Sequence, residues 1–88
     1  MIQREVSIKN RAGLHTRPAA SLVKLAAKFK AEFFIEKDGM EINGKSIIGV
    51  MTLAAEQGAR LLVRFTGEDE VEACQAIVDL VDRGFDEK

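Results

Sequence analysis

The sequence predicts an α+β fold in which helices cover one face of an antiparallel or mixed β-sheet. Stretches in which every second residue is apolar, typical of half-buried strands, are interspersed with stretches whose apolar residues recur at helical spacing. Between two extended stretches, Asp38-Gly39 is typical of a two-residue hairpin turn, which joins antiparallel strands. The expected order is β-α-β-β-α-β-α, an open-faced β-sandwich.

Four strands are expected, at residues 2–8, 32–37, 40–43 and 60–66. The second and third are the arms of the hairpin, and the first and last alternate between apolar and polar residues along most of their length. The side chains expected to face the core are Ile2, Val6, Ile8, Phe33, Ile35, Leu61, Val63 and Phe65. Phe34 and Leu62 fall on the outward side, where we expect them to cover each other, the alternative being an exposed apolar patch.

Three helices are expected. The first, residues 18–29, begins at Pro18, because proline is tolerated in the first turn of a helix. The second, residues 46–53, is short and has Ser46 as a favourable N-cap. The last, residues 69–83, begins with acidic residues that suit a helix N-terminus and precedes Gly84, a natural C-cap. Its expected buried side chains are Val71, Cys74, Ile77, Val78 and Val81.

Length and composition are those of a single globular domain over residues 1–88, with 47% hydrophobic and 31% charged residues. The apolar runs are much shorter than a membrane span and no signal-peptide pattern opens the chain, so no membrane insertion is expected. The single cysteine, Cys74, cannot form an internal disulfide, which favours a reducing cytoplasm.

The net charge of −1 hides a strong asymmetry along the chain. Residues 1–45 carry a charge of +4, whereas residues 46–88 carry −5. The only histidine lies in the basic half, which favours an acidic partner or a phosphate ligand at that end of the molecule. The alternative is a chance division of charge between two solvated surfaces.

The segment at residues 13–18, GLHTRP, holds the only histidine and the only proline of the chain. It is expected to be a loop that ends in a helix N-terminus, with His15 at the point where the helix begins and Arg17 beside it. Free backbone N–H groups and the positive end of the helix dipole favour anions there, phosphate above all. Because a neutral imidazole is a nucleophile and an arginine can hold phosphate oxygens, the segment suggests a histidine that carries a phosphoryl group.

Three other interpretations of His15 are available. A metal site is disfavoured because one histidine and one cysteine, far apart in sequence and in different elements, cannot supply the ligands. A Cys–His nucleophilic pair is disfavoured because Cys74 falls in the apolar stripe of the last helix. An ordinary solvent-exposed loop histidine is the third, and the glycine, arginine and proline around His15 argue against it. We therefore expect neither a metal nor a cofactor.

Two segments of the chain resemble those of a known family. GLHTRP resembles the active-site signature of HPr, the histidine-containing phosphocarrier of the bacterial phosphoenolpyruvate-dependent sugar phosphotransferase system. The segment NGKSIIGVMTL, at residues 43–53, resembles the second signature of that family, which is centred on a regulatory serine, here Ser46. The resemblance covers essentially the whole chain, with the two segments in the right order and at the right distance.

The resemblance implies a four-stranded antiparallel sheet covered on one face by three helices. It implies a carrier more than an enzyme, in which His15 accepts phosphate on Nδ1 from phosphorylated enzyme I and passes it to enzyme IIA domains in sugar uptake. Arg17 would neighbour the phosphohistidine, and Ser46 would be the target of HPr kinase/phosphorylase. A catabolite repressor protein is a further candidate partner. The residues expected to bind phosphate or partners are Thr16, Pro18, Ala20, Lys24, Ile47, Ile48 and Met51.

Two alternative functions are open at this point. A nitrogen-branch or purely regulatory HPr paralogue would have the same site and would move no sugar. A small α+β binding module, regulatory or RNA-binding, would have no covalent chemistry. Its RNA-binding form needs aromatic and basic residues together on the open sheet face, and Phe34 with Arg60 and Arg64 is a faint indication of them. No direct binding of nucleic acid is expected.

Overall fold

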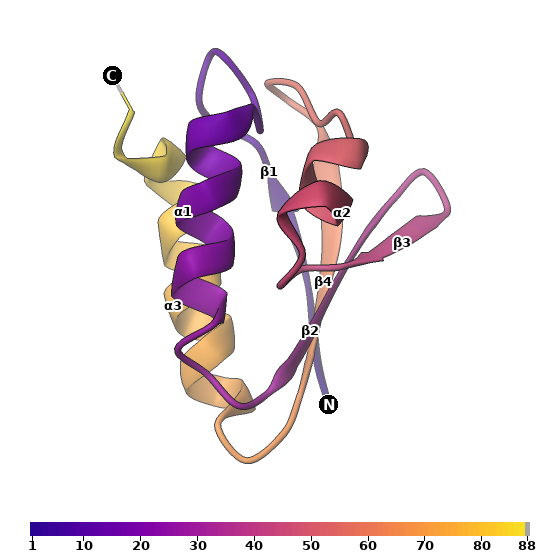
Figure 1. Ribbon diagram of the computed structural model, residues 1–88, viewed down its shortest axis with the longest axis vertical. Helices are drawn as coiled ribbons and strands as arrows, with labels where there is room; N and C mark the ends of the chain where they lie inside the picture. Colours follow the sequence, from indigo (N-terminus) through magenta and orange to yellow (C-terminus); the bar gives the residue numbers. More distant parts are fainter. Residues whose placement is uncertain (88) are drawn as a thin grey trace.

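The structure, a computed structural model, describes residues 1–87; residue 88, the last of the predicted domain, lies outside the described residues. The elements are β1 (Ile2–Ser7), α1 (Thr16–Ala26), β2 (Glu32–Lys37), β3 (Met40–Asn43), α2 (Ile47–Thr52), β4 (Arg60–Thr66) and α3 (Glu70–Asp82), followed by a 3-10 turn at Gly84–Asp86. The strands form one antiparallel sheet in the order β1-β4-β2-β3. The helices pack against this sheet, and α1 is in contact with α3 (Figure 1). The predicted α+β class and element order are confirmed.

The core lies between one face of the sheet and the helices. Along β4 the residues alternate between buried and more exposed positions, and the buried ones cluster with helix residues such as Leu22 and Ile77. Phe33 and Phe65 occupy paired positions of β2 and β4, and their rings stack with centroids 4.8 Å apart. This is the apolar face that the alternation predicted.

The hairpin between β2 and β3 forms where the sequence predicted it. Asp38 has a φ of 51° and Gly39 a φ of 83°, and a two-residue hairpin turn of type I′ requires positive φ at both positions. The turn sets a register in which Lys37 pairs with Met40. That register keeps Ile35 on the core side, where it is buried.

The helices are shorter than predicted. α1 begins at Thr16, so that Pro18 is its third residue, and it ends at Ala26, before the predicted Phe29. Beyond Ala27 the backbone tightens, because the N–H groups of Lys28 and Phe29 bond to carbonyls three residues back. Within residues 1–87, no helix combines the length and apolar character that crossing a membrane requires.

Val71, predicted to be buried in α3, is 53% exposed. At 3.6 residues per turn it lies roughly 120° around the helix from the buried Ile77, which places it at the margin of the apolar stripe. Leu80, which the pattern did not include, lies closer to the centre of the stripe and is buried. The prediction was wrong for Val71 because the buried stripe of α3 occupies a smaller part of the helix circumference than the apolar residues of its sequence do.

The outer face of the sheet is polar at its centre. Phe34 and Leu62 lie on neighbouring strands, two positions apart in register, and both are half-buried. Between them on the same face, Arg64 donates to Glu36 Oε1 at 3.0 Å and also to Glu41. Among the described residues, Phe34 and Leu62 therefore form no exposed apolar patch. Two carboxylates already engage Arg64, which weakens the RNA-binding hypothesis.

Candidate functional site

The loop between β1 and α1 places His15 directly before the first helical residue. Leu14 anchors this loop, because its side chain is buried and its N–H donates to the Ala55 carbonyl at 2.8 Å. Gly13 has a left-handed backbone with a φ of 74°, and a Cβ there would lie 2.6 Å from the Ala55 oxygen. Only glycine fits this position without strain. The glycine of the motif therefore shapes the loop that presents His15.

His15 is the N-cap of α1. Its backbone is extended and its carbonyl accepts the first helical hydrogen bond, from the Ala19 N–H at 2.9 Å. Its imidazole makes no capping bond, and the side chain is 43% exposed. The first N–H groups of a helix have no partner within the helix, and Pro18 has no N–H. The N–H groups of Thr16 and Arg17 are therefore the ones that can face an anion beside His15.

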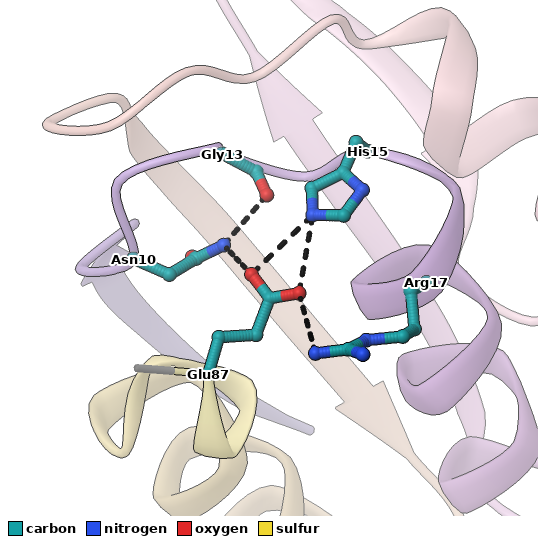
Figure 2. Close-up of polar contacts among 5 residues, drawn as sticks. All are labelled: Asn10, Gly13, His15, Arg17 and Glu87. Atoms are coloured by element: carbon teal, nitrogen blue, oxygen red, sulfur yellow. Dashed lines mark hydrogen bonds and ion pairs between the residues drawn. The ribbon is translucent and has the colours of Figure 1, made fainter.

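Glu87, which no sequence pattern indicated, completes the site. His15 Nε2 lies 3.1 Å from Glu87 Oε2 and 3.3 Å from Oε1, and a guanidinium nitrogen of Arg17 lies 3.4 Å from Oε2. The buried Asn10 donates from Nδ2 to Glu87 Oε1 at 2.8 Å and to the Gly13 carbonyl at 2.7 Å. Figure 2 shows the carboxylate between the imidazole and the guanidinium, with the second imidazole nitrogen pointing away from it.

The turn after α3 brings Glu87 to this place. Gly84, Phe85 and Asp86 all have positive φ values, so the chain changes direction sharply at the end of the helix. Phe85 is buried against the core and holds the turn in position. Glu87 and His15 are 72 residues apart in sequence, and no local spacing links them. Only the tertiary structure reveals that they meet.

The surroundings of Glu87 keep its carboxylate ionised. Burial raises the pKa of this carboxyl group, but hydrogen bonds from Asn10 and His15, with the positive charge of Arg17, outweigh that effect and hold the pKa below its usual value. An ionised carboxylate only accepts hydrogen bonds, so its contact with His15 is a hydrogen bond when Nε2 carries the proton. A pocket of about 250 Å³ opens here, lined by Arg11, Ala12, His15, Arg17 and Glu87. Across residues 1–87, His, Cys, Asp and Glu side chains form no group that could hold a metal ion.

Most of the predicted partner residues lie on the exposed sides of α1 and α2. Those of α1 are spaced four residues apart, on one side of the helix. Those of α2 are apolar, with Ile48 78% exposed. We call this set the α1–α2 surface; its members are Thr16, Ala20, Lys24, Ile47, Ile48 and Met51. A second pocket, of about 300 Å³, is lined by both His15 and Met51 and so joins the histidine to this surface.

Pro18 differs from the other predicted partner residues. Its side chain is fully buried, so it offers no contact area to a partner or a phosphate. As the third residue of α1, it lies within the first turn, where proline fits well. The structure therefore assigns Pro18 to the first turn of the helix, and its place among the binding residues stays a prediction.

Ser46 caps α2, as the sequence predicted. Its Oγ accepts a hydrogen bond from the Gly49 N–H at 3.2 Å, and the residue is exposed. It precedes Ile47 directly and so lies at the edge of the α1–α2 surface. This geometry is compatible with a helix cap alone and with an accessible phosphorylation site.

A histidine exposed at a helix N-terminus, with an arginine beside it and a partly apolar surface next to it, suits the class of small phosphocarrier domains. Residues 2–83 match the family model described as the PTS HPr component phosphorylation site. The chain belongs to the HPr family, the phosphocarriers of the phosphotransferase system.

Individual relatives span nearly the whole chain. The phosphocarrier protein HPr of Xylella fastidiosa is 44% identical over 87 residues, which cover 99% of this chain and 98% of that protein. The HPr-like protein Crh of Halalkalibacterium halodurans is 41% identical over 83 residues, which cover 94% of this chain and 99% of that protein. Among solved structures, HPr-C-His from Thermoanaerobacter tengcongensis matches with a TM-score of 0.96 at 43% identity, covering 100% of this chain and 99% of that one.

Proposed function

We propose that this protein carries phosphoryl groups on His15, taking them from phosphorylated enzyme I and passing them to enzyme IIA domains in cytoplasmic sugar uptake. The observation that carries the proposal is the position of His15, which is exposed at the N-terminus of α1 with Nε2 bonded to Glu87 and the other ring nitrogen directed away. Membership of the HPr family supports the same function. Residues 1–88 would act as one phosphocarrier domain, with neither metal nor cofactor.

The transfer needs few protein groups at this site. The Nδ1 lone pair of His15 attacks phosphorus, the bond between phosphorus and the donor breaks, and the electron pair of that bond goes to the donor. The proton on Nε2 stays in place, so the ring gains positive charge as the new bond forms. The N–H groups of Thr16 and Arg17 and the guanidinium of Arg17 would hold the phosphoryl oxygens.

Partners would dock on the α1–α2 surface. Its α2 side chains are apolar and exposed, and Lys24 and the 77%-exposed Arg17 contribute positive charge. An acidic, partly apolar partner surface suits this combination. Association should weaken with added salt, because exposed charges are screened over about 10 Å at 0.1 M ionic strength.

Phosphorylation of Ser46 by HPr kinase/phosphorylase would act against this docking. Phosphate at the cap of α2 adds a charge of about −1.5 to −2, which an acidic partner repels. The cap position itself tolerates an anion, so the fold should change little. A Ser46→Asp variant that binds enzyme I as tightly as the parent at low salt would leave Ser46 as a helix cap only. A catabolite repressor protein would be a candidate partner of the phosphoserine form.

A purely regulatory paralogue is the second candidate function. Two relatives named HPr-like protein Crh are 41% identical to this chain, close to the values for relatives named HPr. A regulatory protein could present the same surface and move no sugar. Transfer of phosphate to an enzyme IIA domain separates the two functions.

Incubation with enzyme I and radiolabelled phosphoenolpyruvate tests the proposal. The parent should take up the label and lose it to an added enzyme IIA domain. The His15→Ala variant, which changes an exposed loop side chain and should keep the circular dichroism spectrum of the parent, should take up none. Equal labelling of that variant would refute His15 as the acceptor. A labelled parent that passes nothing to any enzyme IIA domain would favour the regulatory paralogue.

A further inference from the structure

We propose that Asn10 is a positioning residue for phosphoryl transfer: its buried side chain holds the backbone of Gly13 and so fixes the loop that presents His15. The inference rests on the proposed phosphocarrier function and adds to it a residue outside both sequence motifs. Asn10 comes three residues before the GLHTRP segment begins and is 6% exposed.

Asn10 binds both polar groups of the Gly13 backbone. Its backbone carbonyl accepts from the Gly13 N–H at 3.1 Å, and its Nδ2 donates to the Gly13 carbonyl at 2.7 Å (Figure 2). Gly13 is buried, and a buried backbone group without a hydrogen bond costs free energy. The side-chain amide supplies the bond that offsets the burial of this carbonyl. It therefore stabilises the left-handed turn of the chain two residues before His15.

Asn10 is itself attached to the rigid part of the fold. Ile8, two residues earlier, is buried and donates from its N–H to the Ala59 carbonyl at 2.9 Å. On its other side, Asn10 packs against the turn after α3, where a Cβ on Gly84 would lie 3.6 Å from the Asn10 Cβ. These contacts hold Asn10 in place in addition to its hydrogen bond to Glu87.

The position suits a short, neutral amide. Nδ2 has two protons, and its two acceptors, the Gly13 carbonyl and the Glu87 carboxylate, use both. An aspartate has the same shape, but its ionised carboxylate only accepts hydrogen bonds and would repel both groups. An alanine would remove the donor altogether. Oδ1 is buried and has no protein partner among residues 1–87, so the donor side of the amide accounts for the orientation of the side chain.

A fixed loop matters for transfer because the His15 side chain is exposed, and its place depends on the backbone that precedes it. Phosphoryl transfer requires the attacking imidazole and the bond that breaks to lie roughly in line. A loop that samples several conformations would present the imidazole in that geometry less often, which lowers kcat. Asn10 is buried and offers no contact area to a partner, so docking on the α1–α2 surface should not depend on it.

Amide hydrogen exchange tests the support of the loop without any partner. The reporter is the Leu14 N–H, which is bonded to the Ala55 carbonyl. Relative to the amides of β4, which report global unfolding, it should exchange about tenfold faster in Asn10→Ala, the scale of one lost hydrogen bond. Glu87→Ala is the control, because it leaves Nδ2 bonded to Gly13, and its Leu14 exchange should stay near that of the parent. Leu14 exchange that rises only in step with β4 in Asn10→Ala, or equally in Glu87→Ala, would overturn the proposal.

Kinetics of phosphorylation by phospho-enzyme I supply the second readout. Asn10→Ala should lower kcat about tenfold and leave KM unchanged, and Asn10→Asp, which keeps the shape without the donor, should be impaired at least as much. Phe65→Leu is the control for lost stability, because it loosens the core where β4 pairs with Ile2, at the end of β1 away from the loop. It should transfer as the parent does.

The kinetic outcomes separate the two proposals. An unchanged kcat in Asn10→Ala, or an equal fall in Phe65→Leu, would refute the positioning role. A parent that takes up no phosphate would instead refute the proposed function, and the role of Asn10 in transfer with it. The exchange result does not depend on phosphate, so it would still show whether Asn10 supports the loop.

Discussion

Replacing Gly13 with alanine tests how firmly the loop between β1 and α1 determines the site. A side chain on left-handed backbone costs roughly 1–2 kcal/mol. The added Cβ would also lie 2.6 Å from the Ala55 oxygen and 2.9 Å from Glu56 Cα, which are backbone atoms that cannot rotate aside. A loop that shifts to relieve this overlap loses the hydrogen bond from Leu14 to Ala55, worth about 1 kcal/mol. The free energy of unfolding should therefore fall by about 2–3 kcal/mol, and transfer to His15 should slow as the imidazole is displaced.

Gly58→Ala is the matched control. Gly58 has a φ of 88°, and a Cβ there would meet nothing within 4 Å, so the substitution should cost only the backbone strain, about 1–2 kcal/mol. Urea denaturation gives the stability of both variants, and rapid-quench kinetics with phospho-enzyme I gives their transfer rates. Equal stability losses in the two variants, or unchanged transfer in Gly13→Ala, would refute the reasoning that close packing against Ala55 fixes the loop.

Three further predictions concern Arg17, Met51 and Asp69. Arg17→Ala should slow phosphoryl transfer about a hundredfold, with partial rescue by lysine, which has no paired donors; unaltered kinetics would make the guanidinium a bystander. Met51→Asp should weaken binding to enzyme I about tenfold by calorimetry, whereas Val71→Asp, at an exposed apolar residue of α3, should not; equal effects would argue against the α1–α2 surface. The Asp69 carboxylate accepts hydrogen bonds from the backbone N–H groups of Lys30 and Ala31, both at 2.8 Å, and the bond from Lys30 is the largest cause of its lowered pKa. Because the folded-state pKa lies below the unfolded one, this stabilisation is present above the unfolded pKa and is lost as pH falls through the folded pKa. Asp69→Asn should therefore be less stable at neutral pH and lose less on acidification, and an acid melting profile identical to the parent's would contradict this.

The strands could be predicted from local pattern, because apolar and polar residues alternate along them and the apolar ones face a single core. The predicted bounds of β2, β3 and β4 agree with the structure residue for residue, and Asp38-Gly39 marked the turn. Helix ends were less predictable, since they depend on which carbonyls remain in reach at the last turn. Val71 and Leu80 show the same limit, because the width of a buried stripe is decided by the neighbouring elements and not by the helix sequence.

The candidate site likewise contains residues that the sequence identifies and residues that only the structure reveals. His15 and Arg17 could be identified from sequence because they are two residues apart, at a helix start that Pro18 marks. Glu87 could not, because it reaches His15 only through the end of α3 and a turn of three residues with positive φ. Asn10 was missed for a related reason. Its role follows from being buried between the loop and that turn, which no sequence motif expresses.

The claim that phosphate is carried on Nδ1 of His15 is tested most directly by the through-bond coupling between phosphorus and the imidazole nitrogens. Protein labelled with ¹⁵N is phosphorylated with enzyme I and phosphoenolpyruvate, and the ³¹P–¹⁵N coupling is measured. The predicted result is coupling to Nδ1 of His15, with the proton still on Nε2. Coupling to Nε2, or phosphorus absent from the His15 ring, would contradict the account.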